Sequence, residues 1–400
     1  RFIGSNALGA VGSSFAIMVL LTSIILGLCI GSGTVFSHLY GANKIDELKN
    51  SFFISFCLIG LLTLVINVSV LLYIDDILAL LQIPKEALYE TKTYLQIIFY
   101  GIGFTSIYNY FAAIMRSLGN SVVPLIFLII SALINIVLDI IFVVPLKMGV
   151  AGAAYATIIA QGFSALGITI YCFKKTPLIR LRKKHLKFKL DIMKNIGNYS
   201  ILSSIQQSIM NFGILMIHGL VNSFGVATMA AFAAVVKIDS FAYLPMQDFG
   251  NALSIYVAQN KGAGKKERIK TGISAALKID TIYGVAISAI VLIFAKPLLT
   301  IFIKSSETEL INIGIQYLYI EGAFYCLIGY LFLFYGLFRG IGKPEMSIIL
   351  TILSLGTRVA LAYILSPIPS IGLVGIWWSI PIGWALADIV GLYIYKRSIK

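Results

Sequence analysis

Long apolar stretches separated by short polar gaps run through this sequence and restrict it to a membrane fold. A helix of residues 11–33, at about 1.5 Å per residue, is longer than the hydrocarbon core of a bilayer, which is about 30 Å thick. Hydrophobic residues make up 59% of the chain and charged residues only 12%, a composition that argues against a water-soluble fold. We predict an all-α membrane protein with eleven spans, near residues 11–33, 51–74, 93–115, 121–145, 149–173, 197–221, 227–257, 272–295, 311–338, 345–366 and 371–395.

The longest charged run lies between two apolar blocks, at residues 174–195, with the sequence KKTPLIRLRKKHLKFKLDIMKN. Lys and Arg accumulate in short loops on the cytoplasmic side of membrane proteins, so we predict that this run is a cytoplasmic linker. Counting spans outward from it gives 22 basic residues in inner loops against six in outer ones. The same count places the carboxyl terminus in the cytoplasm.

The basic residues also indicate which partners to expect. The net charge is +14, but the Lys and Arg residues lie in gaps between spans rather than on a folded basic domain. Anionic lipid headgroups are therefore the expected charged partners, and nucleic acid is not. We expect a monomer, multi-pass in the inner (plasma) membrane.

Short motifs recur in the second half of the chain. The pair Gly41-Ala42 recurs as Gly262-Ala263, the motif at 115–119 recurs at 338–342, and the motif at 149–152 recurs at 372–375. The offset of 221 to 223 residues is about half the chain, and an even number of spans per unit makes the two units parallel. We predict an amino-terminal lobe (1–173), the basic linker (174–195) and a carboxyl-terminal lobe (196–400).

Projecting this repeat backward predicts that one helix is missing. Gly225 follows a complete span at 197–221, whereas its counterpart Gly4 follows only three residues. Eleven spans of an original twelve are therefore expected, and the amino-terminal lobe would lack its first helix.

Polar side chains within spans are the strongest functional signal, because each ionisable group costs roughly 2.5–3.5 kcal/mol at the bilayer centre. Asn135 and Asp139 are four residues apart and share one helix face. Thr157, on the next span, lies at a similar depth when both helices are counted from the turn near Lys147. The spacing predicts that these three residues meet, either as a functional site or as a structural polar cluster.

The order of several motifs resembles a known family. These motifs are GSNALGAVG (4–12), YGANK (40–44), IMRSLGN (114–120), NIVLD (135–139), GVAGAAYATIIAQ (149–161), QNKGAGKKER (259–268) and LFRGIGK (337–343). Together they are similar to the multidrug and toxic compound extrusion transporters over essentially the whole chain. The resemblance implies two six-helix lobes in a V and a central cavity that opens alternately to each side.

The resemblance also implies a function. Members of that family export bulky, often cationic organic compounds in exchange for Na⁺ or H⁺, with no cofactor and no enzymatic activity. Asn135, Asp139 and Thr157 match the cation or proton site of the amino-terminal lobe in that family, so Asp139 is the one position where a bound Na⁺ is expected. A further acid would lie on the first helix, which this chain lacks.

The second half offers candidates for a substrate cavity. Gln207, Asn211 and His218 share one face of the span 197–221, which carries amides and no acid. Lys237 and Asp248 are eleven residues apart on one helix, so we expect both to project into the bundle. Arg358 occupies the position that Asn135 has in the first repeat, and Asp388 or Glu321 would be a buried partner for it.

Two other classes of protein share some of these features. A flippase for a lipid-linked oligosaccharide or a related lipid would also have many spans and interior charges, but with a more cationic cavity or additional spans. An intramembrane enzyme would need paired aspartates, a metal-ligand set or a Ser-His pair, and the spans contain no such arrangement in sequence.

Overall fold

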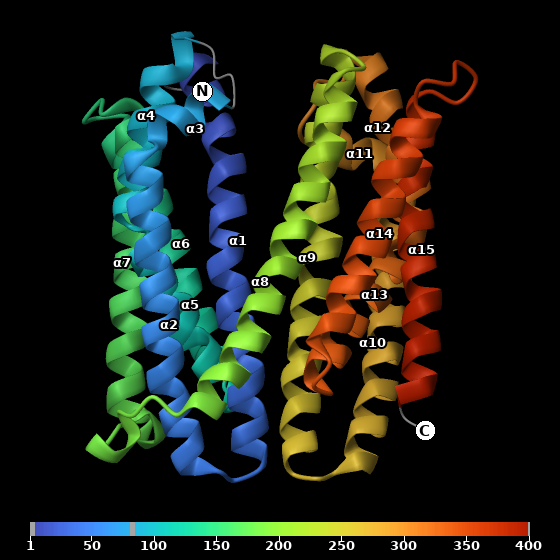
Figure 1. Ribbon diagram of the computed structural model, residues 1–400. Helices are drawn as coiled ribbons and strands as arrows, with labels where there is room; N and C mark the ends of the chain where they lie inside the picture. Colours follow the sequence, from blue (N-terminus) through green and yellow to red (C-terminus); the bar gives the residue numbers. More distant parts are fainter. Residues whose placement is uncertain (1–4, 81–84, 399–400) are drawn as a thin grey trace. The chain divides into compact units, whose positions relative to one another are not determined.

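The computed structural model describes residues 5–80 and 85–398, and within these ranges it is helical with no strand. The chain divides into two compact units, residues 1–208 and 209–400, and α8 (Leu190–Asn222) passes from one to the other. The remaining helices of the amino unit are α1 (Ser5–Gly41), α2 (Ile45–Leu72), α3 (Ile74–Leu80), α4 (Lys85–Tyr100), α5 (Ile102–Ser117), α6 (Val122–Val143) and α7 (Gly149–Lys175), drawn from blue to green in Figure 1. Those of the carboxyl unit are α9 (Val226–Gly262), α10 (Lys266–Ile293), α11 (Ala295–Thr300), α12 (Thr308–Glu321), α13 (Tyr325–Gly340), α14 (Pro344–Leu365) and α15 (Leu373–Ser398).

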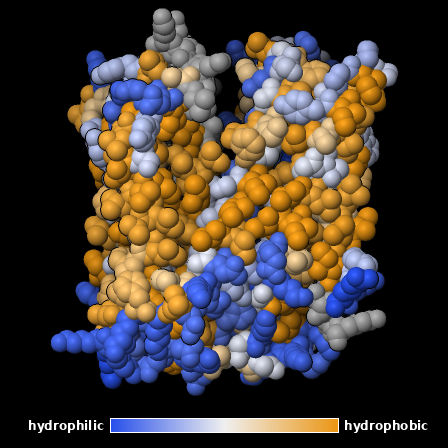
Figure 2. Space-filling model, viewed as in Figure 1, coloured by the Kyte–Doolittle hydropathy of each residue, from blue (hydrophilic) through white to orange (hydrophobic). Residues whose placement is uncertain are grey.

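Membrane-spanning helices account for most of the described chain. Ten helices are long and apolar enough to cross a bilayer, or eleven if the bent pair α4 and α5 counts as one span, which confirms the predicted fold class. On the face shown in Figure 2, apolar residues surround the middle of these helices and hydrophilic residues gather near their ends. Residues 1–4, on which part of the projected repeat depended, lie outside the described residues.

One predicted span is not a straight helix. The span expected at 93–115 bends by 45° at Gly101, between α4 and α5. A Cβ at Gly101 would lie 2.6 Å from the Ile158 side chain of α7, so only glycine allows α7 to approach the bend this closely. The carboxyl unit interrupts its corresponding span with a 3₁₀ turn at Gly322–Phe324.

The predicted repeat is present in the helix boundaries themselves. The bounds of α1 and α9 differ by 221 residues at both ends, and those of α5 and α13 differ by 223 at both ends. Left-handed backbone conformations recur at matched turns as well, at Asn43 and Gly264, Gly119 and Gly342, and Gly149 and Gly372. The two units therefore share one backbone plan.

The first half of α8 packs within the amino unit, against α1. The hydroxyl groups of Ser32 and Ser200 are 2.9 Å apart, and Ser204 donates to the carbonyl of Ile24 at 2.8 Å. A Cβ at Gly31 would overlap the backbone at Tyr199, so small residues set how closely the two helices approach. The boundary between the compact units consequently falls inside α8, later than the predicted start of the carboxyl lobe at residue 196.

The basic linker is folded against the first turn of α2. His185 is buried, and Asn50 of α2 donates from Nδ2 to the carbonyls of His185 (2.8 Å) and Lys187 (2.6 Å). Lys49 donates to the carbonyl of Arg180 at 3.0 Å. In Figure 1 this segment lies at the same end of the amino unit as the turn between α1 and α2.

Candidate transport sites

The amino unit brings together the three polar residues that the spacing predicted. Asn135 of α6 donates from Nδ2 to Oγ1 of Thr157 on α7 at 3.4 Å, and Thr157 donates to the carbonyl of Ala153 at 2.9 Å. Asp139 follows Asn135 by one helical turn on the same face of α6. All three side chains are half-buried.

Tyr94 of α4 completes this cluster, which we call the α6–α7 site (Tyr94, Asn135, Asp139 and Thr157). The Tyr94 hydroxyl bonds to Thr157 and lies within electrostatic range of the Asp139 carboxyl. Oδ1 of Asp139 is buried and has no hydrogen-bond partner among the described residues. The site therefore offers neutral oxygens beside one carboxyl with unused acceptor capacity, the donor set that suits a bound proton or Na⁺.

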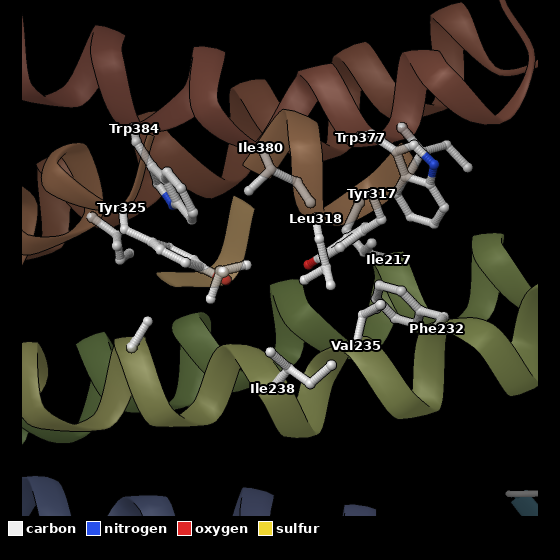
Figure 3. Close-up of a cluster of buried hydrophobic side chains, with 14 of the residues drawn as sticks. Ile217, Phe232, Val235, Ile238, Tyr317, Leu318, Tyr325, Trp377, Ile380 and Trp384 are labelled. Atoms are coloured by element: carbon white, nitrogen blue, oxygen red, sulfur yellow. The ribbon is translucent and has the colours of Figure 1, made fainter. Parts of the chain in front are cut away.

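The carboxyl unit contains a different cluster, which lines a cavity of about 180 Å³. Five of the ionisable residues that line it come from five helices: His218 of α8, Asp239 of α9, Glu321 of α12, Tyr325 of α13 and Arg358 of α14. We call these five residues the Arg358 cluster. Aromatic side chains form much of the surrounding wall, where Phe232 of α9 stacks on Trp377 of α15 with ring centroids 5.6 Å apart (Figure 3).

The Arg358 cluster is deeply buried. Arg358 is 9% exposed, Glu321 6% and Asp239 9%. The Tyr325 hydroxyl donates to Oδ1 of Asp239, and the guanidinium lies within electrostatic range of both carboxyls. Two carboxyls therefore face one guanidinium, so one of them must carry a proton or a bound cation if the cluster is to be neutral.

Of the two acids predicted as a partner for Arg358, Glu321 and Asp388, only Glu321 lies beside it. Glu321 lines the same cavity, whereas Asp388 lines a separate one formed by α9, α10, α13 and α15. Asp239, which the sequence reasoning did not select, is the second acid. Two features of the sequence could have identified Asp239. It is an ionisable residue inside a predicted span, and it lies on the same helix face as the apolar residues Phe232, Val235 and Ala242, whose side chains are buried in α9.

The predicted substrate-cavity residues do not form one group. His218 lines the cavity of the carboxyl unit, whereas Gln207 falls in the amino unit and Asn211 does not line the cavity. Lys237 and Asp248 were expected to project into the bundle, but both side chains are exposed, so neither packs inside the carboxyl unit. Their eleven-residue spacing puts them on one face of α9, but the face that packs is the one carrying Asp239; Nζ of Lys237 instead lies 5.6 Å from the centroid of the Phe302 ring.

Two repeated helical units, each with a polar cluster between membrane-spanning helices, are typical of polytopic membrane transporters. The chain belongs to the MatE family, whose model matches residues 1–141 and 200–364. This confirms the resemblance seen in the sequence motifs.

Individual relatives match over most of their length. The chain is 31% identical to the probable multidrug resistance protein YpnP of Bacillus subtilis, over 88% of this chain and 79% of that protein. It is 26% identical to the probable multidrug resistance protein YoeA of the same organism, over 100% and 87% respectively. Among solved structures, a MOP superfamily transporter from Pyrococcus furiosus matches with a TM-score of 0.94 and 26% identity, over 99% of this chain and 89% of that one.

Proposed function

We propose that this protein is a secondary antiporter that exports organic, often cationic, compounds in exchange for Na⁺ or H⁺ by alternating access. The names of its relatives support export of small organic compounds: two are probable multidrug resistance proteins, and a 25% identical Staphylococcus aureus relative is the multidrug export protein MepA. The relatives are transporters rather than enzymes, and no cofactor is needed for such an exchange.

The α6–α7 site is the proposed coupling site, and the unpartnered Oδ1 of Asp139 is the observation that carries this proposal. A carboxyl that lies inside a membrane span is stable when it holds a proton or a cation. Proton and Na⁺ would thus compete for Asp139, with Asn135 and Thr157 supplying neutral oxygens. Capture of the ion from outside changes the local charge, and that change would disfavour the arrangement that holds the substrate.

Efflux driven by an imposed ion gradient in proteoliposomes tests this proposal. Asp139→Asn mimics a permanently neutral carboxyl, so it should abolish gradient-driven efflux while the protein still folds and inserts. Thr157→Val should weaken coupling less, because it removes one neutral oxygen and leaves the carboxyl. Running each gradient alone, Na⁺ or H⁺, identifies the coupling ion.

Normal ion dependence in Asp139→Asn would contradict the assignment. Coupling would then belong to the Arg358 cluster, whose Asp239 and Glu321 are the other buried acids that line a cavity together. Substitution of Glu321 by Gln in the same assay would separate the two sites.

The orientation follows from the basic residues. We propose that the linker at 174–195 and the carboxyl terminus lie in the cytoplasm of a cell whose plasma membrane holds the protein as a monomer. Anionic headgroups of the inner leaflet would then contact the exposed Lys and Arg side chains of the linker.

A further inference from the structure

A second buried pair of carboxyls lies in the carboxyl unit, outside both clusters described above. Asp280 is near the middle of α10 and Asp388 is within α15, and the two lie within electrostatic range of each other. Asp280 is 2% exposed and packs against the backbone of α13 at Gly329, where a Cβ would overlap its carboxyl. The pair is therefore built into the contact between these helices.

Neither acid has its hydrogen-bonding capacity satisfied. Both oxygens of Asp388 and Oδ2 of Asp280 are buried without a hydrogen-bond partner among the described residues. No Lys, Arg or His of the described chain lies within 4 Å of either carboxyl. Two acids at this depth need a counter-charge or protons, and the fold supplies no cationic side chain to them.

Asp388 lines a cavity of about 290 Å³ whose other walls are almost entirely apolar. The walls come from α9, α10, α13 and α15, and they include Leu253, Leu277, Leu333 and Leu392, with Tyr330 and Tyr395 as aromatic members. Leu277 and Leu392 are exposed on the surface of the carboxyl unit, so the cavity is a groove open on one side. We call it the Asp388 groove.

We propose that the Asp388 groove binds a lipophilic organic cation, with Asp388 as the nearer counter-charge beneath the groove wall and Asp280 as a second negative charge. Aliphatic and aromatic walls suit the apolar body of such a ligand, and Tyr330 and Tyr395 can present ring faces to its positive centre. An acyl chain of a lipid would fill the groove equally well but would leave both carboxyls uncompensated. Charge complementarity therefore favours a cation.

Other ionisable groups near the pair are neutral or weakly acidic. The Cys326 thiol of α13 lies within range of Asp280, and the Tyr335 hydroxyl of α13 lies within range of Asp388. Neither group supplies a positive charge, and the Arg339 guanidinium, which lies within range of the same Tyr335 hydroxyl, donates to Oδ1 of Asn251. The negative charge of Asp280 and Asp388 can therefore be balanced by a bound cationic ligand or by protons taken up from water.

Photolabelling of the purified protein in lipid nanodiscs tests the proposal. The probe is azidobenzyltrimethylammonium, a photoreactive quaternary ammonium ion, and labelled residues are mapped by mass spectrometry. Labels are expected on α10 and α15 around Leu277 and Leu392. Benzyltrimethylammonium should compete for them, and neopentylbenzene, which has the same shape without the charge, should not.

Variants then separate this groove from the other sites. Asp388→Asn is expected to lower labelling of the groove by roughly tenfold or more, because a buried counter-charge is lost. Asp76→Asn, which removes an exposed carboxyl of the amino unit, should leave that labelling unchanged. Since no ion gradient is applied, the result does not depend on whether the antiport proposal is correct.

Three outcomes would overturn the proposal: groove labels that persist in Asp388→Asn, groove labels that neopentylbenzene displaces as well as the cation does, or labels that fall only outside the groove. If Asp388→Asn fails to fold, Leu277→Trp supplies the test, since it narrows the groove without touching either acid. Leu61→Trp makes the same change on the exposed surface of α2 and is its matched control. Loss of labelling in the first and not in the second would support the groove.

Discussion

Nε2 of His185 lies 3.0 Å from Oδ1 of Asp46, and this contact ties the basic linker to the first turn of α2. The backbone N–H of Arg182 donates to Nδ1 of the same imidazole at 2.9 Å, so a neutral His185 carries its hydrogen on Nε2 and donates it to Asp46. The second oxygen of Asp46 accepts from Lys184 at 2.7 Å. The linker is therefore a docked element of the amino unit.

Removing the buried donor of Asn50 should release the linker. Asn50→Ala leaves the carbonyls of His185 and Lys187 without this donor, a loss of about 1–3 kcal/mol in the free energy of unfolding. Faster tryptic cleavage within residues 174–195 and a lower Tm of the purified protein are the expected measurements. Glu47→Gln, a change on the exposed side of the same turn, is the control and should leave the cleavage rate near that of the wild type.

The membrane orientation predicts which loops react with an impermeant thiol reagent. In a background without the four native cysteines, Lys183→Cys should be shielded from reagent added outside intact cells, and Ser305→Cys should react. Both positions are exposed, whereas His185 in the same linker is 3% exposed and unsuitable as a reporter. Reaction at residue 183 together with protection at 305 would reverse the proposed orientation.

Charge balance in the Arg358 cluster predicts unequal effects of neutralising its members. Glu321→Gln leaves one carboxyl facing one guanidinium, so its effect on Tm should be small. Arg358→Met removes the positive charge that faces the two buried acids Asp239 and Glu321 and should cost about 3–5 kcal/mol. Thermal unfolding of the purified variants checks this order, and Arg397→Met, at the end of α15, is the control for loss of an arginine. Equal destabilisation by the Glu321 and Arg358 changes would show that the cluster is not organised around one excess carboxyl.

The contact between α1 and α8 predicts opposite effects for two glycine substitutions. Gly31→Ala forces a methyl group into the backbone at Tyr199, an overlap that should destabilise the protein by about 1–3 kcal/mol. Gly60→Ala, on α2, meets nothing within 4 Å and should stabilise it by roughly 0.5–1 kcal/mol, because alanine is the better helix former. Tm values of the two variants should move in opposite directions; a neutral Gly31→Ala would mean that α8 separates from α1 at little cost.

Hydropathy alone located the spans, since lipid leaves few alternatives to helices of this length. It did not reveal the bend at Gly101, because a glycine inside an apolar run does not show which helix will approach it. Spacing within one helix and across one turn was enough to bring Asn135, Asp139 and Thr157 together. Asp239 and Glu321 come from helices far apart in the sequence, so nothing local indicated that they would meet at Arg358.

The sequence also did not indicate which face of a helix is packed and which is exposed. The eleven-residue spacing of Lys237 and Asp248 correctly predicted one face of α9, but not that this face is exposed. Helix α9 has apolar residues around most of its circumference, so the periodicity of its sequence does not indicate which face packs against other helices. The packing of Phe232 and Ala242 decides it.

Because the two units share one backbone plan, each residue of the α6–α7 site can be compared with a counterpart in the carboxyl unit. At an offset of 223 residues, Asn135, Asp139 and Thr157 correspond to Arg358, Ala362 and Ile380, while Tyr94 corresponds to another tyrosine, Tyr317. Ala362 and Ile380 are fully buried. Copying the α6–α7 site into the carboxyl unit would require Arg358→Asn, which would leave Asp239 and Glu321 without their guanidinium. The shared backbone plan therefore does not make the two polar clusters interchangeable.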